Sequence, residues 1–206
     1  GDSYVVISGL LDASGRDANE QGGSIQILAD HISTTKNALL DASGHSATSP
    51  KRPSNSGSAT FRDDKTLDNG VRSEAEFLAQ QSRAGGTIKI GGDYLGKGNT
   101  QTAKTVTVTD GSYIFNDAIV SGDAGRTIIW SDEITDYAGL TFARGGQKSG
   151  HGGFLETSGK QNLKANGYVD LSSRTHGYNQ GTYLLDPDDI IIYGNVDPSF
   201  TSTAVS

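Results

Sequence analysis

The chain has 206 residues, a net charge of −7 and 28 glycines, and it contains neither cysteine nor methionine. The lack of cysteine excludes disulfides and thiolate metal sites. The lack of a basic block argues against nucleic-acid binding, because phosphate contacts need clustered Lys and Arg. No apolar stretch approaches the roughly 20 residues of a membrane span. The sequence starts in mid-pattern at "GDSYVVISGLLDASG" without a signal peptide, so we expect a piece of a longer protein.

The first feature in chain order is a repeated hexapeptide, LLDASG, which occurs at residues 10–15 and again at 39–44. A related pattern follows each copy, as GGSIQILADHIS from Gly22 and as GGTIKIGGDYLG from Gly85. A verbatim repeat is typical of a structural unit that is used more than once. The hexapeptide is therefore interpreted mainly as scaffold, in which Asp, Ser and Gly turn a corner.

Looser copies of the second pattern follow at a regular spacing, and they start at Ala124, Gly152 and Gln180. The last two intervals between copies are both 28 residues. The earlier intervals are longer, which indicates extra residues at 45–84 and in the Thr-rich segment 99–109. We therefore interpret the chain as five copies of a unit of about 28 residues, two of which carry additions.

Within each copy the apolar residues recur two positions apart, which is the period of a strand. One column of aligned residues contains Ile25, Ile88, Thr127, Leu155 and Tyr183, and the next contains Ile27, Ile90, Ile129, Thr157 and Leu185. Short strands joined by turns at a constant period predict an all-β solenoid with one coil per copy. The predicted core includes Ile25, Ile27, Ile88, Ile90, Ile129, Leu155 and Leu185. Alternation predicts exposed side chains at Gln26, Lys89 and Glu156.

Two further columns complete the predicted coil. A third apolar column contains Ile32, Leu95, Ile134, Leu163 and Ile190. The LLDASG segments and their later equivalents supply another wall, which contains Leu11, Leu40, Ile114, Thr141 and Val169. Because stacked parallel strands lie about 4.8 Å apart, each column should form a continuous interior stack.

The ordered motifs resemble a known family. The series is LLDASG…GGSIQILAD, GGTIKIGGDYLG, AGRTIIWSDEIT, FARGGQKSGHGGFLETSGK and GTYLLDPDDIII. This order resembles the filamentous-haemagglutinin-like, two-partner-secretion adhesins over residues 9–193. The resemblance implies a right-handed parallel β-helix. It also implies a secreted exoprotein that leaves a Gram-negative bacterium through a dedicated outer-membrane transporter.

At the cell surface, the resemblance implies a structural and adhesive role in cell adhesion and virulence, without catalysis and without a cofactor. The receptor would be a glycan or protein of a host cell or biofilm. The lack of cysteine agrees with export of an unfolded chain, because locked disulfides would obstruct it. We expect the β-helix to span residues 1–194, and 195–206 to be a tail or the start of the next segment.

The insertion at residues 45–84 departs from the family pattern. It opens with Pro, Ser, Asn and Gly, which favours an irregular loop. The stretch SEAEFLAQQSR then predicts a short helix near 74–83, because Ser73 and Glu76 fit a capping box. The insertion is either a partner-facing loop or a tolerated cover of one face.

The insertion also supplies most of the candidate binding residues. They are Lys51, Arg52, Phe61, Arg62 and Arg72. A locally basic loop on an acidic chain suits contact with an acidic glycan, a membrane surface or another part of the exoprotein. Trp130, the only tryptophan, is a sixth candidate. Alternation turns it outward, where it either stacks on a sugar or protein or packs under the insertion or the Thr-rich segment.

Stacked carboxylates raise the alternative of a polysaccharide-active β-helix enzyme. Asp12 and Asp41 should lie on adjacent coils at roughly 5 Å, close to the separation in a retaining glycosidase. However, both occupy corner positions, where an Asp side chain caps the turn. We therefore assign no catalytic residue.

No metal site is predicted. DPDD at 186–189 is the densest carboxylate cluster, but the calcium-roll pattern is missing. The histidines fall in different units and are expected to be exposed turn residues; they are His31, His45, His151 and His176.

Overall fold

The computed structural model describes residues 1–15, 20–44 and 84–187, which form three parallel sheets of five strands and one short 3₁₀ helix, η1 (Tyr94–Gly96). Sheet A contains, in order, β1 (Tyr4–Ile7), β4 (His31–Thr34), β7 (Thr105–Val108), β10 (Ile134–Tyr137) and β13 (Asn162–Ala165). Sheet B contains β2 (Leu10–Asp12), β5 (Leu39–Asp41), β8 (Tyr113–Phe115), β11 (Leu140–Phe142) and β14 (Tyr168–Asp170). Sheet C contains β3 (Ser24–Ile27), β6 (Thr87–Ile90), β9 (Arg126–Ser131), β12 (Phe154–Gly159) and β15 (Thr182–Leu185).

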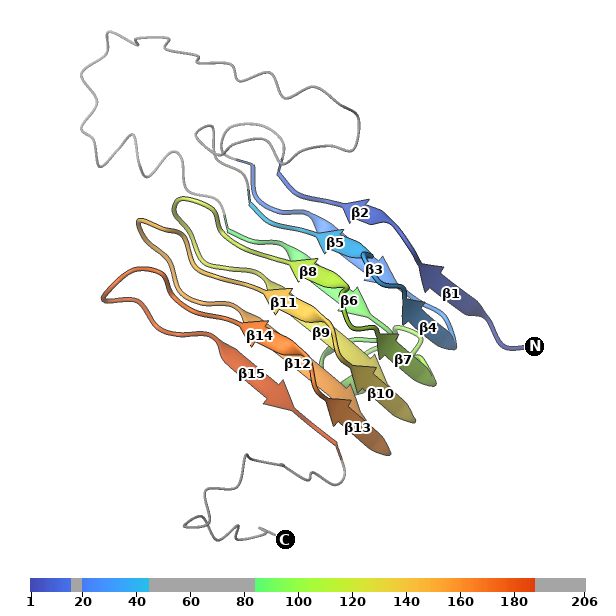
Figure 1. Ribbon diagram of the computed structural model, residues 1–206. Coiled ribbons are helices and arrows are strands. Elements are labelled where there is room, and N and C mark those ends of the chain that lie inside the picture. The colour runs from blue at the N-terminus through green and yellow to red at the C-terminus, as the bar shows by residue number, and fades with distance from the viewer. Residues whose placement is uncertain (16–19, 45–83, 188–206) are drawn as a thin grey trace, which may run out of the picture.

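Successive strands visit sheets A, B and C in turn, so three strands make one coil of a solenoid. Figure 1 shows the coils stacked side by side along one axis. This arrangement confirms the predicted all-β parallel β-helix of about five coils within the described residues. The predicted tail and most of the insertion, with its expected helix, lie outside those residues.

The strand register of sheet C matches the two main predicted columns. Ile25 pairs with Ile88, which pairs with Thr127. The same stack continues through Leu155 to Tyr183. Two residues later, the second stack runs from Ile27 to Leu185 in the predicted order. The structure buries Ile25, Ile27, Ile88, Ile90, Ile129 and Leu155, whereas Leu185, on the last described strand, is half-buried.

The predicted wall from the LLDASG segments is also present. In sheet B, Leu11 pairs with Leu40, and Leu40 pairs with Ile114. Thr141 and Val169 continue the stack on the last two coils. The three middle members, Leu40, Ile114 and Thr141, have no exposed surface. Each coil thus buries its apolar edge only against its neighbours, which explains why the unit is repeated.

The third predicted column is wrong in two of its members. The observed stack in sheet A runs through Ile32, Val106, Thr135 and Leu163. Leu95 lies instead in η1, because residues 91–104 form a loop between β6 and β7 that displaces the register. Ile134 is 45% exposed. Strand β9 is longer than the strands before it in sheet C, and the inward-facing residue that pairs with Val106 is therefore Thr135, one residue later than predicted.

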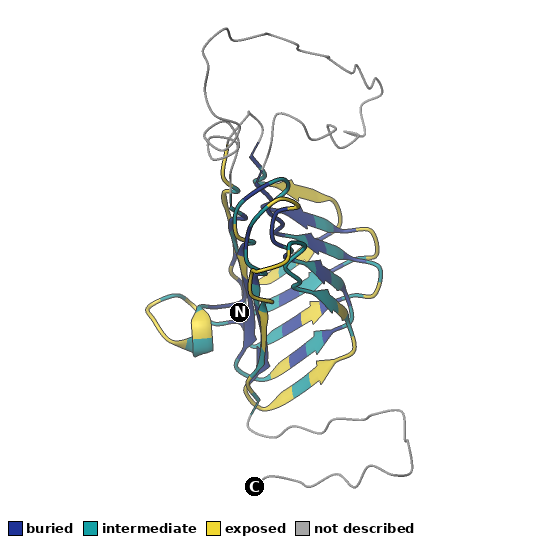
Figure 2. Cartoon of the chain, turned by 90° about the vertical axis from the view of Figure 1, so that its left-hand side faces the viewer, coloured by how far each residue is buried: buried dark blue, intermediate teal, exposed yellow. Residues whose placement is uncertain are grey.

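Residues 91–104 cover part of the outer face of sheet C, and we call them the covering loop. The loop stands out from one side of the solenoid in Figure 2. The loop covers Glu156, whose outward-facing side chain is completely buried. The predicted exposure of Glu156 is therefore wrong. Lys89 is half-buried on the same face, whereas Gln26, on the first coil, is exposed as predicted.

The first and last coils are the most exposed parts of the solenoid (Figure 2). All residues of β2 in the first coil are exposed, and all residues of β13 in the last coil except Leu163 are exposed. Each of these coils has a neighbour on one side only within the described residues. In that part of the chain, we find no helix long and apolar enough to cross a membrane.

Candidate functional site

The stacked aspartates of sheet B cap their own corners. Asp12 lies directly opposite Asp41 on the next coil, as the sequence predicts. Asp12 Oδ1 accepts hydrogen bonds from the backbone N–H of Ser14 at 2.9 Å and from its hydroxyl at 2.6 Å. Asp41 Oδ1 accepts from the backbone N–H of Ser43 at 3.0 Å. These are Asx turns, so the carboxylates hold the corner of the coil.

The column does not continue as a cluster of acids. Beyond Asp41 it passes through Phe115 and Phe142 before it reaches Asp170. Asp170 again accepts from a backbone N–H two residues later, that of Ser172, at 3.1 Å. The two aromatic rings stack at 5.3 Å between centroids. The geometry therefore supports the capping interpretation of these aspartates better than a catalytic pair.

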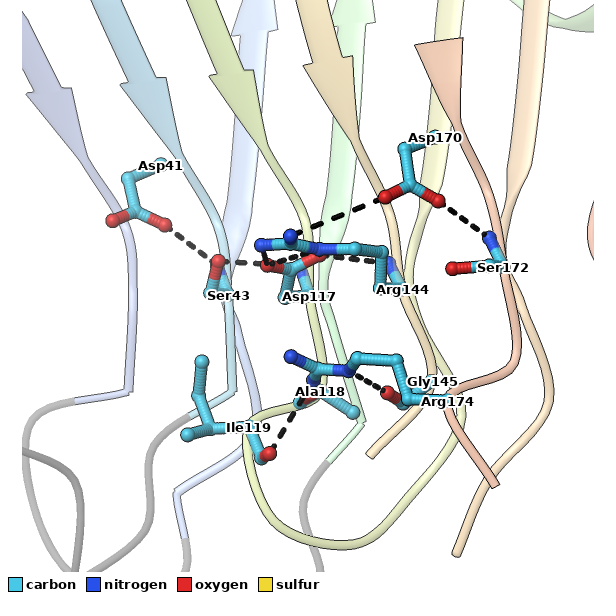
Figure 3. A network of polar contacts seen from close by, with 10 residues as sticks. All are labelled: Asp41, Ser43, Asp117, Ala118, Ile119, Arg144, Gly145, Asp170, Ser172 and Arg174. Carbon is cyan, nitrogen blue, oxygen red and sulfur yellow. Dashed lines mark hydrogen bonds and ion pairs between the residues drawn. The ribbon is translucent and has the colours of Figure 1, made fainter. Parts of the chain in front are cut away.

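A polar network joins four coils next to these corners (Figure 3). The backbone N–H of Asp117 donates to Ser43 Oγ at 3.2 Å. The Arg144 guanidinium donates to Asp117 Oδ2 at 2.6 Å and to Oδ1 at 3.2 Å. Its other nitrogen lies 4.0 Å from Asp170 Oδ2. The hydrogen bond to Asp117 raises the pKa of Arg144 above its usual value, so the guanidinium stays charged.

Arg174 adds a second clamp at this corner. Its Nε donates to the Gly145 carbonyl at 2.6 Å, and its terminal nitrogen donates to the carbonyls of Ala118 and Ile119. Burial lowers the pKa of Arg174, and the carbonyls satisfy its N–H groups. Figure 3 shows Arg174 lying alongside the Arg144–Asp117 pair. We call Ser43, Asp117, Arg144, Asp170 and Arg174 the corner clamp, and its bonds hold neighbouring coils together.

The predicted binding residues are not brought together by the described structure. Those of the insertion, namely Lys51, Arg52, Phe61, Arg62 and Arg72, lie outside the described residues.

Trp130 faces outward as predicted, and it is only 6% exposed. Of the two alternatives, packing under a neighbouring segment is therefore the one observed, although the segment is the covering loop at Gly92 and Gly96 and not the Thr-rich residues 99–109. Gly92 and Gly96 of the covering loop lie directly on its indole, whose N–H donates to Asp132 at 3.2 Å.

Glu156 is a second buried group beneath the covering loop. Its carboxylate accepts from the backbone N–H of Leu95 at 3.1 and 3.3 Å and from the Ser158 hydroxyl at 3.0 Å. Burial raises the pKa of Glu156 above the usual value for glutamate, and these hydrogen bonds oppose the shift only in part. Leu95 has a φ of 58°, a left-handed conformation that directs its N–H at this carboxylate.

A groove runs along the edge of sheet C where its strands begin. A glycine precedes each strand, and these are Gly23, Gly86, Gly125, Gly153 and Gly181. A Cβ on Gly86 would lie 2.0 Å from the Gly23 carbonyl oxygen, so close packing of the coils requires glycine here. The last four of these glycines line a hollow with a volume of about 460 Å³.

Polar and aromatic side chains border this groove. They are Gln21, Arg126, Phe154, Gln180 and Thr182. The Arg126 guanidinium lies 4.4 Å from the centroid of the Phe154 ring and 4.4 Å from that of Tyr94 in η1. The two rings meet edge to face at 5.8 Å.

Sequence reasoning missed this Arg126 cluster. A usable signal was present, since Arg126 and Phe154 occupy the same repeat position directly after a glycine. The contribution of Tyr94 carried no such signal, because the covering loop lies outside the periodic pattern.

No cation site emerges from the geometry. Within residues 1–15, 20–44 and 84–187, His, Asp and Glu side chains form no group of three or more suited to a metal ion. His31, expected in a turn, lies in β4, where its ring stacks on Tyr4 at 4.8 Å between centroids.

Comparison with known proteins supports the fold. No protein-family model matches the sequence, and a search of curated proteins gives no match. Among solved structures, the chain is similar to the HMW1 secretion domain from Haemophilus influenzae, with a TM-score of 0.53 and 24% sequence identity. The match covers 90% of this chain but only 39% of that one. At this identity the likeness concerns the fold alone, and it agrees with the three stacked parallel sheets.

Proposed function

We propose that this chain is a segment of a large exoprotein that a Gram-negative bacterium exports by two-partner secretion and displays at its surface. Its role there is structural and adhesive, without catalysis. The observation that supports the proposal is the β-helix itself, whose fold is similar to that of a secretion domain. The order of its sequence motifs also resembles that exoprotein family.

The physical properties of the chain suit this route. It contains no cysteine, so nothing locks the chain before it crosses the outer membrane. The strands of each coil pair only with strands of the adjacent coils, so coils can form one after another as the chain emerges. The adhesive part of the proposal places contacts with a glycan or protein receptor on features that depart from the repeat, including the basic residues of the insertion.

Export is tested by expressing the chain behind a cleavable signal sequence in a bacterium with or without an outer-membrane transporter of the two-partner type. We expect folded, protease-resistant protein in the medium only when the transporter is present. Protein that stays in the periplasm in both strains would contradict the proposal.

The alternative function is a polysaccharide-active enzyme that uses Asp12 and Asp41. Assays on acidic polysaccharides, with Asp12→Asn and Asp41→Asn as controls, separate it from the adhesive role. Turnover that both substitutions abolish, without loss of folding, would favour the enzyme.

A further inference from the structure

The Arg126 cluster presents a positive group that two aromatic rings hold in place. Its charge acts on the nearby Glu156 carboxylate, where it opposes the rise in the pKa of that group. Arg126 is exposed and contacts the rings of Tyr94 and Phe154, each at 4.4 Å. In the described part of the chain it forms no ion pair within 4.0 Å. Aromatic rings that pack on the face of a guanidinium restrict its motion, and they leave its N–H groups available for hydrogen bonds. The N–H edge can therefore donate two parallel hydrogen bonds to a carboxylate.

The groove beside Arg126 is suited to an extended ligand. Its border runs from Gln21 on the first coil to Gln180, just before the last strand. Four coil spacings of about 4.8 Å give a length of about 19 Å. Gln180 Oε1 accepts from the backbone N–H of Ser173 at 3.0 Å, so Gln180 offers its amide N–H groups to a ligand hydroxyl, and Gln21 offers a second amide. Phe154 supplies a ring against which a sugar face can pack.

The floor of the groove argues against a peptide that adds as a strand. Its backbone N–H groups already donate to other coils or to the adjoining corner. Gly85 donates to Asp123 at 2.9 Å, and Gly181 donates to Leu171 at 2.8 Å. Strand addition needs a free row of N–H and C=O groups, which these residues do not offer. A ligand here must be recognised by the side chains along the border.

The glycines themselves are explained by packing, since a Cβ on Gly85 would lie 2.2 Å from the Asn116 carbonyl oxygen. Ligand recognition here therefore depends on Arg126 and its aromatic neighbours, and the hollow provides the space beside them. The net charge of −7 disfavours a densely charged polyanion. A sugar chain with isolated carboxylates fits both the single Arg126 and the acidic surroundings.

We propose that this groove binds an acidic oligosaccharide, with one sugar carboxylate on Arg126 and neighbouring sugars against Phe154, Gln21 and Gln180. This inference rests on the proposed adhesive function and gives it a ligand class and a site on the coils. Thr182, on the last strand, offers a further hydroxyl at the border.

The test is titration calorimetry of the full chain with two probes, a hyaluronan hexasaccharide and sialyllactose, each compared with its neutral methyl ester. We expect at least one acid form to bind and its ester to bind about tenfold more weakly, the value of one charged hydrogen-bonded contact. If neither acid binds, or if acid and ester bind equally, the proposal is overturned.

The matched variants are Arg126→Gln, Arg126→Lys and Lys164→Gln. Lys164 is exposed on β13 of sheet A, so its replacement removes the same charge away from the groove. We expect Arg126→Gln to lower the affinity for the acid probe about tenfold. Arg126→Lys should lower it less, because lysine keeps the charge but cannot donate two parallel hydrogen bonds from one planar group. Lys164→Gln should change the affinity by less than about twofold. Equal losses for Arg126→Gln and Lys164→Gln would overturn the site.

Two further measurements keep the outcomes distinct. A chain that lacks residues 51–80 should bind the acid probe like the intact chain. If the shortened chain loses binding while the Arg126→Gln variant keeps it, the assignment of the site to the groove is overturned. Export is measured separately on the intact chain and on Arg126→Gln. If neither the intact chain nor the Arg126→Gln variant is exported, but the intact chain binds the probe, the proposed function is contradicted and the assignment of the binding site to the groove is not.

Discussion

Arg144 holds Asp117 from 27 residues further along the chain, with Nη2 donating to Oδ2 at 2.6 Å. The side chain of Asp117 is 5% exposed and that of Arg144 is 28% exposed. The bond therefore joins two neighbouring coils at a largely desolvated corner. A pair in this setting is costly to break on one side, because the remaining charge stays buried.

Replacement of Arg144 by Gln should destabilise the protein by about 2–4 kcal/mol, below the upper range for fully buried pairs because Arg144 keeps some solvent contact. Urea unfolding measures the change. The matched control is Lys104→Gln, because Lys104 pairs with Asp2 at 2.7 Å on the exposed surface, and this change should leave the unfolding curve almost unchanged. A double variant with Asp117→Asn should lose less than the sum of the two single changes; simple additivity would show that the pair is not coupled.

The apolar stack of sheet C provides a test of the register. Ile90 has no exposed surface and lies between Ile27 and Ile129. Ile90→Ala should cost about 2–5 kcal/mol, since the stacked coils can close the cavity only in part. Gln26→Ala, on the exposed face of the neighbouring strand, should stay within about 0.5 kcal/mol. Similar unfolding curves for the two variants would show that the inward and outward positions are wrongly assigned.

Glu156 predicts a pH dependence. Burial raises the pKa of Glu156 in the folded protein. The ionised form is thus penalised by folding, and the stability contributed by this group falls as the pH rises past the pKa of the unfolded chain. Glu156→Gln should therefore raise the melting temperature at pH 7 and have little effect at pH 3.5. A lower melting temperature at pH 7 would show that the Leu95 and Ser158 bonds outweigh burial.

The only tryptophan of the chain reports on the covering loop. A Cβ on Gly96 would lie 2.3 Å from the Trp130 ring, and φ at Gly96 is +60°. Gly96→Ala should push the loop away and shift the fluorescence of Trp130 to longer wavelength, with faster quenching by acrylamide. Gly177→Ala is the control, because its φ of +88° carries a similar strain with nothing within 4 Å. A red shift in the control as well would mean that strain alone loosens the fold.

These residues also show how far the sequence could lead. The stacks through Ile27 and Leu40 were predictable, because a strand period repeated at a fixed interval leaves little choice of register. The stack through Leu95 was not, since the covering loop adds residues where the periodic pattern stops. The outward side of Trp130 followed from alternation. Its burial, like that of Glu156, depends on a loop whose path no periodicity encodes, and the same loop brings Tyr94 to Arg126.

The last prediction concerns the insertion. Chain outside the repeat is free of the constraints on the stacked columns, so deletion of residues 51–80, with a short Gly-Ser turn in their place, should leave the solenoid folded. Loop entropy changes only weakly with length, and the melting temperature should change little. Binding to cells or to a protein receptor should be lost if the basic residues of the insertion carry it, whereas Arg126→Gln should spare that activity. A deleted chain that unfolds would show that the insertion is a structural cover. A deleted chain that folds and still binds would transfer receptor recognition to the coils, with the groove at Arg126 as the first place to look.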